Sequence, residues 1–180
     1  MKINMVSEDF SVWEISGFDL PDITVDSGEL YHQADSIPPL RSVVEITSNN
    51  KELFYSTWEK NTKIIEEQVK TDSIDNLLID QMWKGAIQNF KWHDRGSVRI
   101  LSDKSKYIMT SHFDNRLIFG VLIINLIDNK DSTEFENGYT APTKKGTGIF
   151  MLNNNDLHRI QVTTDRLIGY QTLSVKDCLP

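Results

Sequence analysis

The chain has 180 residues, of which 39% are hydrophobic and 25% are charged, which is the composition of a soluble globular protein. Its formal net charge of −7 disfavours a nucleic-acid partner, because phosphate contacts require clustered Lys and Arg. No apolar run reaches the length of a membrane-spanning helix, and the first residues contain no apolar signal segment. We therefore expect a cytoplasmic protein.

The length predicts one domain over residues 1–180, since no linker, repeat or low-complexity segment divides the chain. The single cysteine, Cys178, cannot form an internal disulfide, which fits a reducing compartment. Residues 1–47 contain short β-like runs separated by glycine and proline, and we expect strands and loops that cover one side of a core. His32 has no neighbouring ligand there and is interpreted as a surface residue.

Two amphipathic helices are predicted between residues 51 and 90. The first spans 51–70, because apolar residues recur at helical spacing and Asn49 with Glu52 forms a start signal. The second spans 74–90, with an apolar stripe that includes Ile74, Leu77 and Phe90. Aromatic residues such as Trp58 and Trp83 are interpreted as packing residues, so that both helices buttress a sheet.

The remainder of the chain is rich in strand signals. Turn residues, among them Asn137-Gly138, separate short β-prone runs. The predicted strands are 97–101, 106–114, 117–126, 132–136, 147–152, 159–163 and 167–175. Many short, evenly spaced strands favour a sandwich or barrel, and a jelly roll uses eight of them. The fold class is thus mainly β (α+β), with residues 1–96 as N-terminal strands and helical buttress and 97–175 as the core.

The sequence Ser111-His112-Phe113-Asp114 has the form His-x-Asp in one of these strands. Residues i and i+2 of a strand point to the same face, so His112 and Asp114 can converge on one metal ion, and His158 can complete the set from another strand. Two imidazoles and one carboxylate on one side of an ion are the coordination of non-haem Fe(II) oxygenases. A rival pair, His93-Asp94, consists of adjacent residues that would face opposite ways.

The order His112, Asp114, His158, Arg166 resembles the iron- and 2-oxoglutarate-dependent dioxygenases, of the prolyl-hydroxylase-like type. The resemblance covers residues 97–175 and implies a double-stranded β-helix, a jelly roll with two buttressing helices before it. It implies Fe(II) as cofactor, 2-oxoglutarate as cosubstrate and O₂, with the ion held by His112, Asp114 and His158. It also implies a glycine-led strand at 147–152 and a Gly-Gly turn, which is absent before Thr133.

Arg166 is the expected partner of the far carboxylate of 2-oxoglutarate, because a buried carboxylate is costly unless it is paired and arginine offers a planar bidentate fork. Candidates for a second contact to the cosubstrate are Asn125, Tyr107 and Arg99.

We expect a hydroxylase that acts on a C–H bond of a protein side chain, an amino acid or a small metabolite. One alternative is a non-oxidative, cupin-like metal-binding protein or isomerase that uses the same ligands without a cosubstrate. Another is a metal-free β-sandwich interaction protein. Residues His112 and Arg166 separate these alternatives, since only the first function needs both.

Overall fold

The computed structural model of the chain describes residues 1–7, 12–26, 41–77, 79, 81–92, 95–101, 108–112, 118–152, 158–161, 164 and 166–174. Within these ranges, it does not describe the side chains of residues 7, 41–42, 82–83, 101, 108–112, 118 and 160–161.

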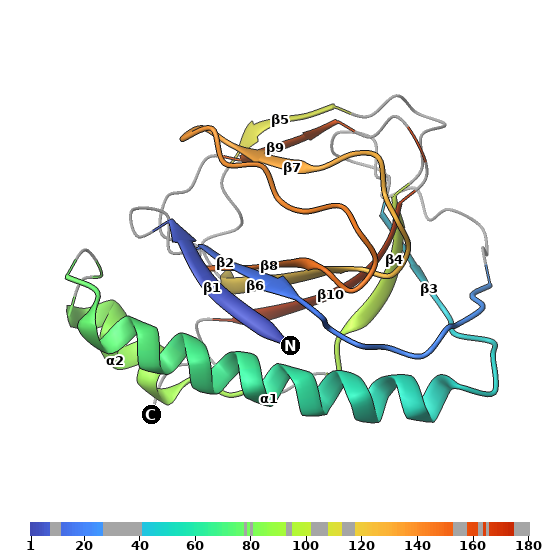
Figure 1. The fold of residues 1–180 in the computed structure, drawn as a ribbon, viewed down its shortest axis with the longest axis horizontal. Helices are drawn as coiled ribbons and strands as arrows, with labels where there is room; N and C mark the ends of the chain where they lie inside the picture. The colour runs from blue at the N-terminus through green and yellow to red at the C-terminus, as the bar shows by residue number, and fades with distance from the viewer. Residues whose placement is uncertain are drawn as a thin grey trace.

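Two antiparallel sheets lie one above the other, and two helices cover the lower face of the larger sheet (Figure 1). The large sheet has seven strands in the order β1 (Lys2–Ser7), β2 (Val12–Ser16), β8 (Gly148–Leu152), β6 (Ile118–Asn125), β10 (Arg166–Ser174), β4 (Ser97–Leu101) and β3 (Arg41–Val44). The small sheet has the order β5 (Ile108–His112), β9 (His158–Gln161) and β7 (Thr133–Phe135). The predicted mainly β, α+β class is confirmed.

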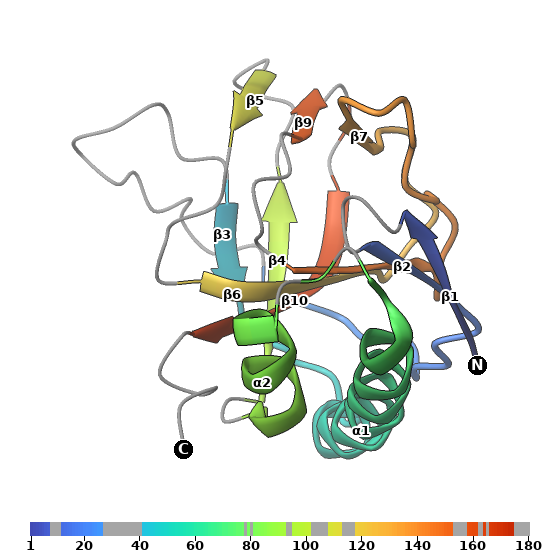
Figure 2. The same cartoon turned by 90° about the vertical axis from the view of Figure 1, so that its left-hand side faces the viewer.

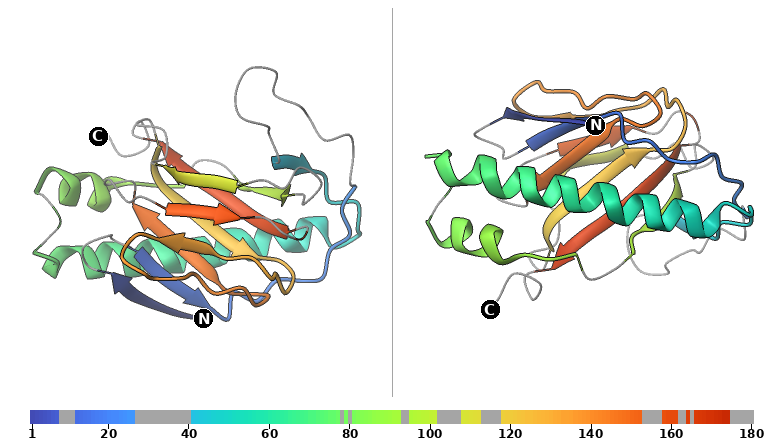
Figure 3. Two further views of the ribbon diagram at one scale, coloured as in Figure 1. Left: turned by 90° about the horizontal axis from the view of Figure 1, so that it is seen from above. Right: turned by 60° about the horizontal axis from the view of Figure 1, so that its bottom comes forward.

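The strands from β4 to β10 pair in a nested order around one turn. β4 pairs with β10, β5 with β9 and β6 with β8, and Glu134 of β7 bridges Thr140. The turn at the centre of this nest contains Gly138 with φ +88°, a conformation that glycine adopts without steric cost. Successive strands alternate between the large and the small sheet, and Figure 3 (left) shows β9 between β5 and β7 above the large sheet.

The helices α1 (Lys51–Asp75) and α2 (Gln81–Asn89) run side by side beneath the large sheet (Figure 2). The sequence prediction placed the boundary between them too early, since α1 continues to Asp75 and α2 begins only at Gln81. The buried stripe of α1 includes Val69 and Ser73, which lie one above the other at a spacing of four residues. Ile74 therefore points away from the core and is 58% exposed, and Leu77, just beyond α1, is 92% exposed.

The large sheet separates two hydrophobic cores. The face toward the helices packs large side chains, among them Trp13, Leu122 and Phe150, against α1 and α2. The opposite face, called the inner face from here on, points toward the small sheet. Its core consists of Val12, Val121, Phe135, Ala141, Ile149, Met151, Ile168 and Tyr170. Because side chains alternate along a strand, β2, β6, β8 and β10 contribute residues to both cores.

Trp58 fastens α1 to the centre of the large sheet. Its Nε1 donates a hydrogen bond of 2.7 Å to Oε1 of Gln171 in β10, and both residues are buried. The indole lies against two glycines: a Cβ on Gly169 would come within 2.2 Å of the ring, and a Cβ on Gly96 within 2.8 Å of Nε1. Only glycine at both positions leaves room for the ring. Figure 3 (right), in which the underside comes forward, shows α1 crossing in front of the strands.

This contact predicts that Gly169→Ala destabilises the protein. The new methyl group would overlap a rigid, buried ring, and overpacking of this kind costs about 1–3 kcal/mol. The free energy of unfolding, measured by chemical denaturation, should fall by that amount. The matched control is Gly85→Ala in α2, where a Cβ would meet nothing within 4 Å. That variant should gain about 0.5–1 kcal/mol from helix propensity. Equal changes in the free energy of unfolding at both positions would contradict the close contact between Gly169 and the indole of Trp58.

Candidate functional site

His158, the predicted distal ligand, begins the central strand of the small sheet. The Cα atoms of His112 in β5 and Phe135 in β7 are its register partners on the two sides. The backbone positions of two of the three predicted metal ligands are therefore register partners on neighbouring strands. A register irregularity in β5 lies between Met109 and His112. His112 and His158 are 46 positions apart in the sequence, so only strand pairing brings them together.

The side chain of His158 is buried, with 6% of its surface exposed. Its ring centroid lies 5.8 Å from that of Phe135, at an interplanar angle of 39°. Phe135 belongs to the core on the inner face, so His158 shares that apolar surrounding. A buried imidazole in such a place is either a packed core residue or a metal ligand shielded from water, and the second role is the one that the sequence predicts.

Several predicted residues lie outside the described part of the chain. They include Asp114, the third predicted ligand, and Tyr107, a predicted cosubstrate contact; His32, the pair His93-Asp94, and Cys178 lie outside it as well. His112 is described only in its backbone. Among the described residues, no three His, Cys, Asp or Glu side chains gather into a group that could hold a metal ion. The ligand set thus stays a prediction.

Arg166, the predicted cosubstrate anchor, begins β10 and is only 3% exposed. It lies on the same face of the strand as Ile168 and Tyr170, because residues at i, i+2 and i+4 of a strand share a face. Both of these neighbours belong to the core on the inner face. Arg166 in the large sheet and His158 in the small sheet therefore both adjoin the core on the inner face.

Arg99 is a second arginine on the inner face. Its Cα pairs with that of Ile168, so it shares the face of that residue in the neighbouring strand β4. Its guanidinium carbon lies 3.7 Å from the ring centroid of Tyr170, which is a close cation–π stack. Nε of Arg99 donates to Oγ of Ser97 at 3.2 Å, and this hydroxyl in turn donates to the carbonyl of Tyr170 at 3.3 Å.

Asn125, at the end of β6, bonds to the two segments that flank β7. Its Nδ2 donates to the carbonyl of Pro142 at 2.8 Å and to that of Thr147 at 3.0 Å. Its Oδ1 accepts a hydrogen bond of 2.7 Å from Nδ2 of Asn129. Both asparagines are buried. This network gives Asn125 a structural role, and its predicted contact with a cosubstrate stays a prediction.

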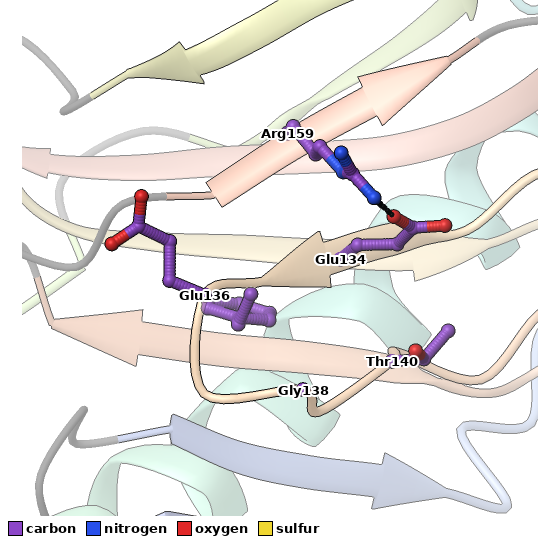
Figure 4. A pocket seen from close by; sticks show the side chains of 6 residues that line it. Glu134, Glu136, Gly138, Thr140 and Arg159 are labelled. Carbon is purple, nitrogen blue, oxygen red and sulfur yellow. Dashed lines mark hydrogen bonds and ion pairs between the residues drawn. The ribbon is translucent and has the colours of Figure 1, made fainter.

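A concave pocket of about 540 Å³ lies beside β7 (Figure 4). One of its lining residues is Phe135, whose ring packs against His158. On its outer rim, Nε and Nη2 of Arg159 both donate to Oε2 of Glu134, at 2.7 and 2.6 Å. This ion pair is exposed, so it contributes at most about 1 kcal/mol. The pocket is lined by Glu134, Phe135, Glu136, Gly138, Thr140 and Arg159.

Tyr139 ties the turn after β7 to the large sheet. Its hydroxyl donates a hydrogen bond of 2.8 Å to Oε2 of Glu14 in β2, and its ring packs 5.7 Å from that of Phe135. Burial and, after it, the hydrogen bond to Glu14 raise the pKa of Tyr139 far above its ordinary value near 10. Phe135 also contacts His158. The hydrogen bond between Tyr139 and Glu14, called the clasp from here on, therefore helps to fix the ring against which His158 packs.

No protein-family model matches the chain, and a search of curated proteins yields no match either. No helix among the described residues has the length and apolarity needed to cross a membrane.

Two residues of this region were not identified from the sequence. Tyr170 lies four positions after Arg166 on the same strand face, and the period of two in a predicted strand could have identified it as a neighbour. Glu14 could not have been found in this way, because its contact with Tyr139 joins residues 125 positions apart.

The asparagine network predicts that Asn125→Leu destabilises the protein. The change would leave the part-buried carbonyl of Pro142 and the buried amide of Asn129 without this partner, and a buried polar group left unsatisfied costs about 1–3 kcal/mol. Thermal or chemical denaturation measures the effect. The control is Asn89→Leu, at an exposed helical position, where the change should stay within about 0.5 kcal/mol. A stability loss no larger at Asn125 than at Asn89 would refute the role of the network.

The raised pKa of Tyr139 in the clasp predicts that the free energy of unfolding falls at alkaline pH. A folded-state pKa raised above the unfolded value contributes stability that is present below pH ~10 and is lost as the pH rises beyond it. Tyr139→Phe cannot ionise at this position, so its free energy of unfolding should fall less steeply above pH ~10 than that of the wild type. Denaturation at several alkaline pH values tests this, and parallel profiles for the two proteins would contradict it.

Proposed function

We propose that this protein is an Fe(II)- and 2-oxoglutarate-dependent dioxygenase that hydroxylates a C–H bond of a protein side chain, an amino acid or a small metabolite. The observation that carries the proposal is the strand register of the small sheet. It aligns His112 with the buried His158, while Arg166 lies on the inner face of the facing sheet. Three residues selected from sequence order alone thus belong to strands that line one space.

The strand pairing supports a double-stranded β-helix as the fold. A jelly roll is a long antiparallel hairpin wrapped across two sheets, so its first strand pairs with its last and its strands alternate between the sheets. The nested pairs β4–β10, β5–β9 and β6–β8 follow this order, and the Glu134–Thr140 bridge continues it. The two helices beneath the large sheet correspond to the buttress expected in this family.

His112, Asp114 and His158 would hold the iron. Two neutral imidazoles and one carboxylate suit Fe(II) and leave an open side for other ligands. When bound, Fe(II) would supply the activation of O₂ and the coordination of the keto acid of 2-oxoglutarate. In the overall reaction, one oxygen atom of O₂ enters succinate as 2-oxoglutarate loses CO₂, and the other enters the substrate, converting C–H to C–OH.

Arg166 would bind the far carboxylate of 2-oxoglutarate. The residue is 3% exposed, and a carboxylate brought to such a depth requires a charged, hydrogen-bonding partner. A guanidinium meets this need with two parallel N–H donors. The apolar neighbours Ile168 and Phe135 would exclude water from the reacting groups. Asn125, Tyr107 and Arg99 are the further contacts to the cosubstrate that the sequence predicts.

The proposal predicts a weak visible charge-transfer band when Fe(II) and 2-oxoglutarate are added anaerobically to the apoprotein. In Arg166→Gln the half-saturating concentration of 2-oxoglutarate should rise about 30-fold or more, because truncating one partner of a buried charge pair costs about 2 kcal/mol or more. His158→Ala should abolish the band.

Arg159→Gln is the matched control, because this arginine follows His158 but is exposed on the other side of the strand. Its half-saturation should equal that of the wild type. A wild-type protein that binds the metal without forming the band would refute the dioxygenase and favour a cupin-like metalloprotein. A protein that takes up no Fe(II) or Mn(II), with no rise in melting temperature, would refute a metal function altogether.

A further inference from the structure

β1 forms one margin of the large sheet (Figure 2). Its only strand partner among the described residues is β2, so its other edge pairs with no described strand. Every second residue of such an edge directs its N–H and C=O groups away from the sheet. Proline, charge or a bulge commonly protects a natural edge. Residues 3–6 contain neither proline nor charge, and the register irregularity of β1 lies between Met5 and Ser7, at its end.

A groove of about 650 Å³ runs beside β1, between the strand and the last turns of α1. Ile3 and Met5 line it from the strand side. Both are half-buried and pack against the core on the helix side, whereas Asn4 between them is exposed. This alternation places Ile3 and Met5 on the face of β1 toward α1. An unpaired strand edge and a cavity thus lie side by side.

The wall of the groove that α1 forms is acidic. Asp72 and Asp75 both line the groove and are three residues apart, so they are neighbours on the helix surface. Asp72 accepts hydrogen bonds from two neutral donors, Nε1 of Trp13 at 2.8 Å and Nε2 of Gln68 at 2.7 Å. Asp75 is exposed. The described residues that line the groove include no Lys or Arg, so a cation that balances these carboxylates would come from a ligand.

The groove also has an apolar part. Leu77, just beyond α1, lines it and is 92% exposed. Met5 lines it from β1 and is only half-buried. An apolar side chain placed between Leu77 and Met5 would remove apolar surface of all three groups from water. The groove therefore offers two kinds of contact, one for a basic side chain and one for an apolar side chain.

We propose that β1 and this groove bind an extended segment of a partner protein that carries a lysine or arginine and, two positions away, an apolar residue. The segment would add a strand beside β1, and its backbone would hydrogen-bond to the open edge. Every second side chain of the added strand points toward α1. The basic one would lie against Asp72 and Asp75, and the apolar one would cover Met5 and Leu77.

A second copy of this chain fits the groove less well. In a symmetric antiparallel pair of β1 strands, the helix sides of both sheets lie on the same side, so Ile3 and Met5 of the copy would enter the groove. Neither residue carries a charge, and the carboxylates of both molecules would remain without a cation. Charge complementarity therefore favours a partner protein with a basic segment.

The test measures the affinity of labelled octapeptides, which can cover the six residues of β1, by fluorescence anisotropy. The reference peptide alternates threonine with lysine and valine. In a second peptide glutamate replaces lysine. A third carries N-methyl groups on two successive central residues, which removes a backbone donor from each edge of the peptide and keeps every side chain. Hydrogen exchange of the amides of residues 3–6 is followed with and without the reference peptide.

The reference peptide should bind, and the glutamate and N-methylated peptides should bind about 10-fold more weakly or worse, because each lacks one of the two required contacts. The amides of residues 3–6 that exchange rapidly in the free protein should exchange more slowly in the complex.

The protein variants test the acidic wall. Asp75→Asn should weaken binding of the reference peptide about 3-fold and the double variant Asp72→Asn/Asp75→Asn about 10-fold, because exposed ion pairs are individually weak. The matched control is Glu67→Gln, which removes one charge from an exposed position of α1 that does not line the groove. Its affinity should equal that of the wild type. Melting temperatures establish that each variant is folded.

Three outcomes overturn the inference. In the first, the N-methylated peptide binds as tightly as the reference peptide, so no strand is added. In the second, Glu67→Gln weakens binding as much as Asp75→Asn, which would indicate only a general attraction to an acidic protein. In the third, no peptide binds in the millimolar range, and sedimentation then shows whether a second copy occupies the edge instead.

This inference does not rest on the proposed dioxygenase function. The groove lies on the helix side of the large sheet, whereas Arg166 and the core around His158 lie on the inner face. A protein without the iron charge-transfer band could still bind the peptide, and a protein that binds no peptide could still form the band. The two proposals therefore fail separately.

Discussion

The arrangement of the site depends on the packing of Trp58 against the large sheet. α1 can lie close to β10 only because Gly169 leaves space for the indole, and the hydrogen bond to Gln171 sets the ring in one orientation. Gln171 and Gly169 face the helix, while Ile168 and Tyr170 face the other way along the same strand. A strand supported so firmly from one side can present its other side as a rigid surface.

The two faces of the large sheet differ in composition. The face toward α1 and α2 is almost wholly apolar, and its packing supplies the hydrophobic stabilisation of the fold. The inner face combines an apolar core with polar groups, among them Arg166, Arg99 and the Glu14–Tyr139 pair. Burial of charge is costly, so such groups persist in an interior only where partners or ligands compensate for it. This asymmetry supports the proposal that the functional site lies between the two sheets.

The small sheet contributes to the site through register. His158 lies between His112 and Phe135, and a shift by one residue in either neighbouring strand would move a different side chain to this face. The tight Asn137-Gly138 turn and the Tyr139–Glu14 hydrogen bond limit such slippage on the β7 side. The pairing of β5 with β9 is in turn constrained by the outer pair β4–β10, which lies in the other sheet.

Much of the secondary structure could be predicted because local signals determine it. The alternation in 97–101 and 147–152, and the helical stripe through Phe54, Trp58 and Val69, depend on neighbours a few residues away. The boundary between the helices could not be predicted in this way. Ile74 is apolar yet exposed, and the apolar pattern alone predicts that it is buried. The bounds of β1 could not be predicted within residues 1–47 either, because it is an edge strand with a single partner and only a weak alternation.

The sequence by itself determined the fold class, the approximate strands and the candidate residues His112, His158 and Arg166, because residue type and spacing carry that information directly. Only the tertiary structure decided that His112 and His158 are register partners, that Asn125 anchors a loop, and that Arg99 stacks on Tyr170. Each of these contacts joins residues far apart in the chain. Such pairings arise from the packing of whole sheets, and no local pattern of residues encodes them.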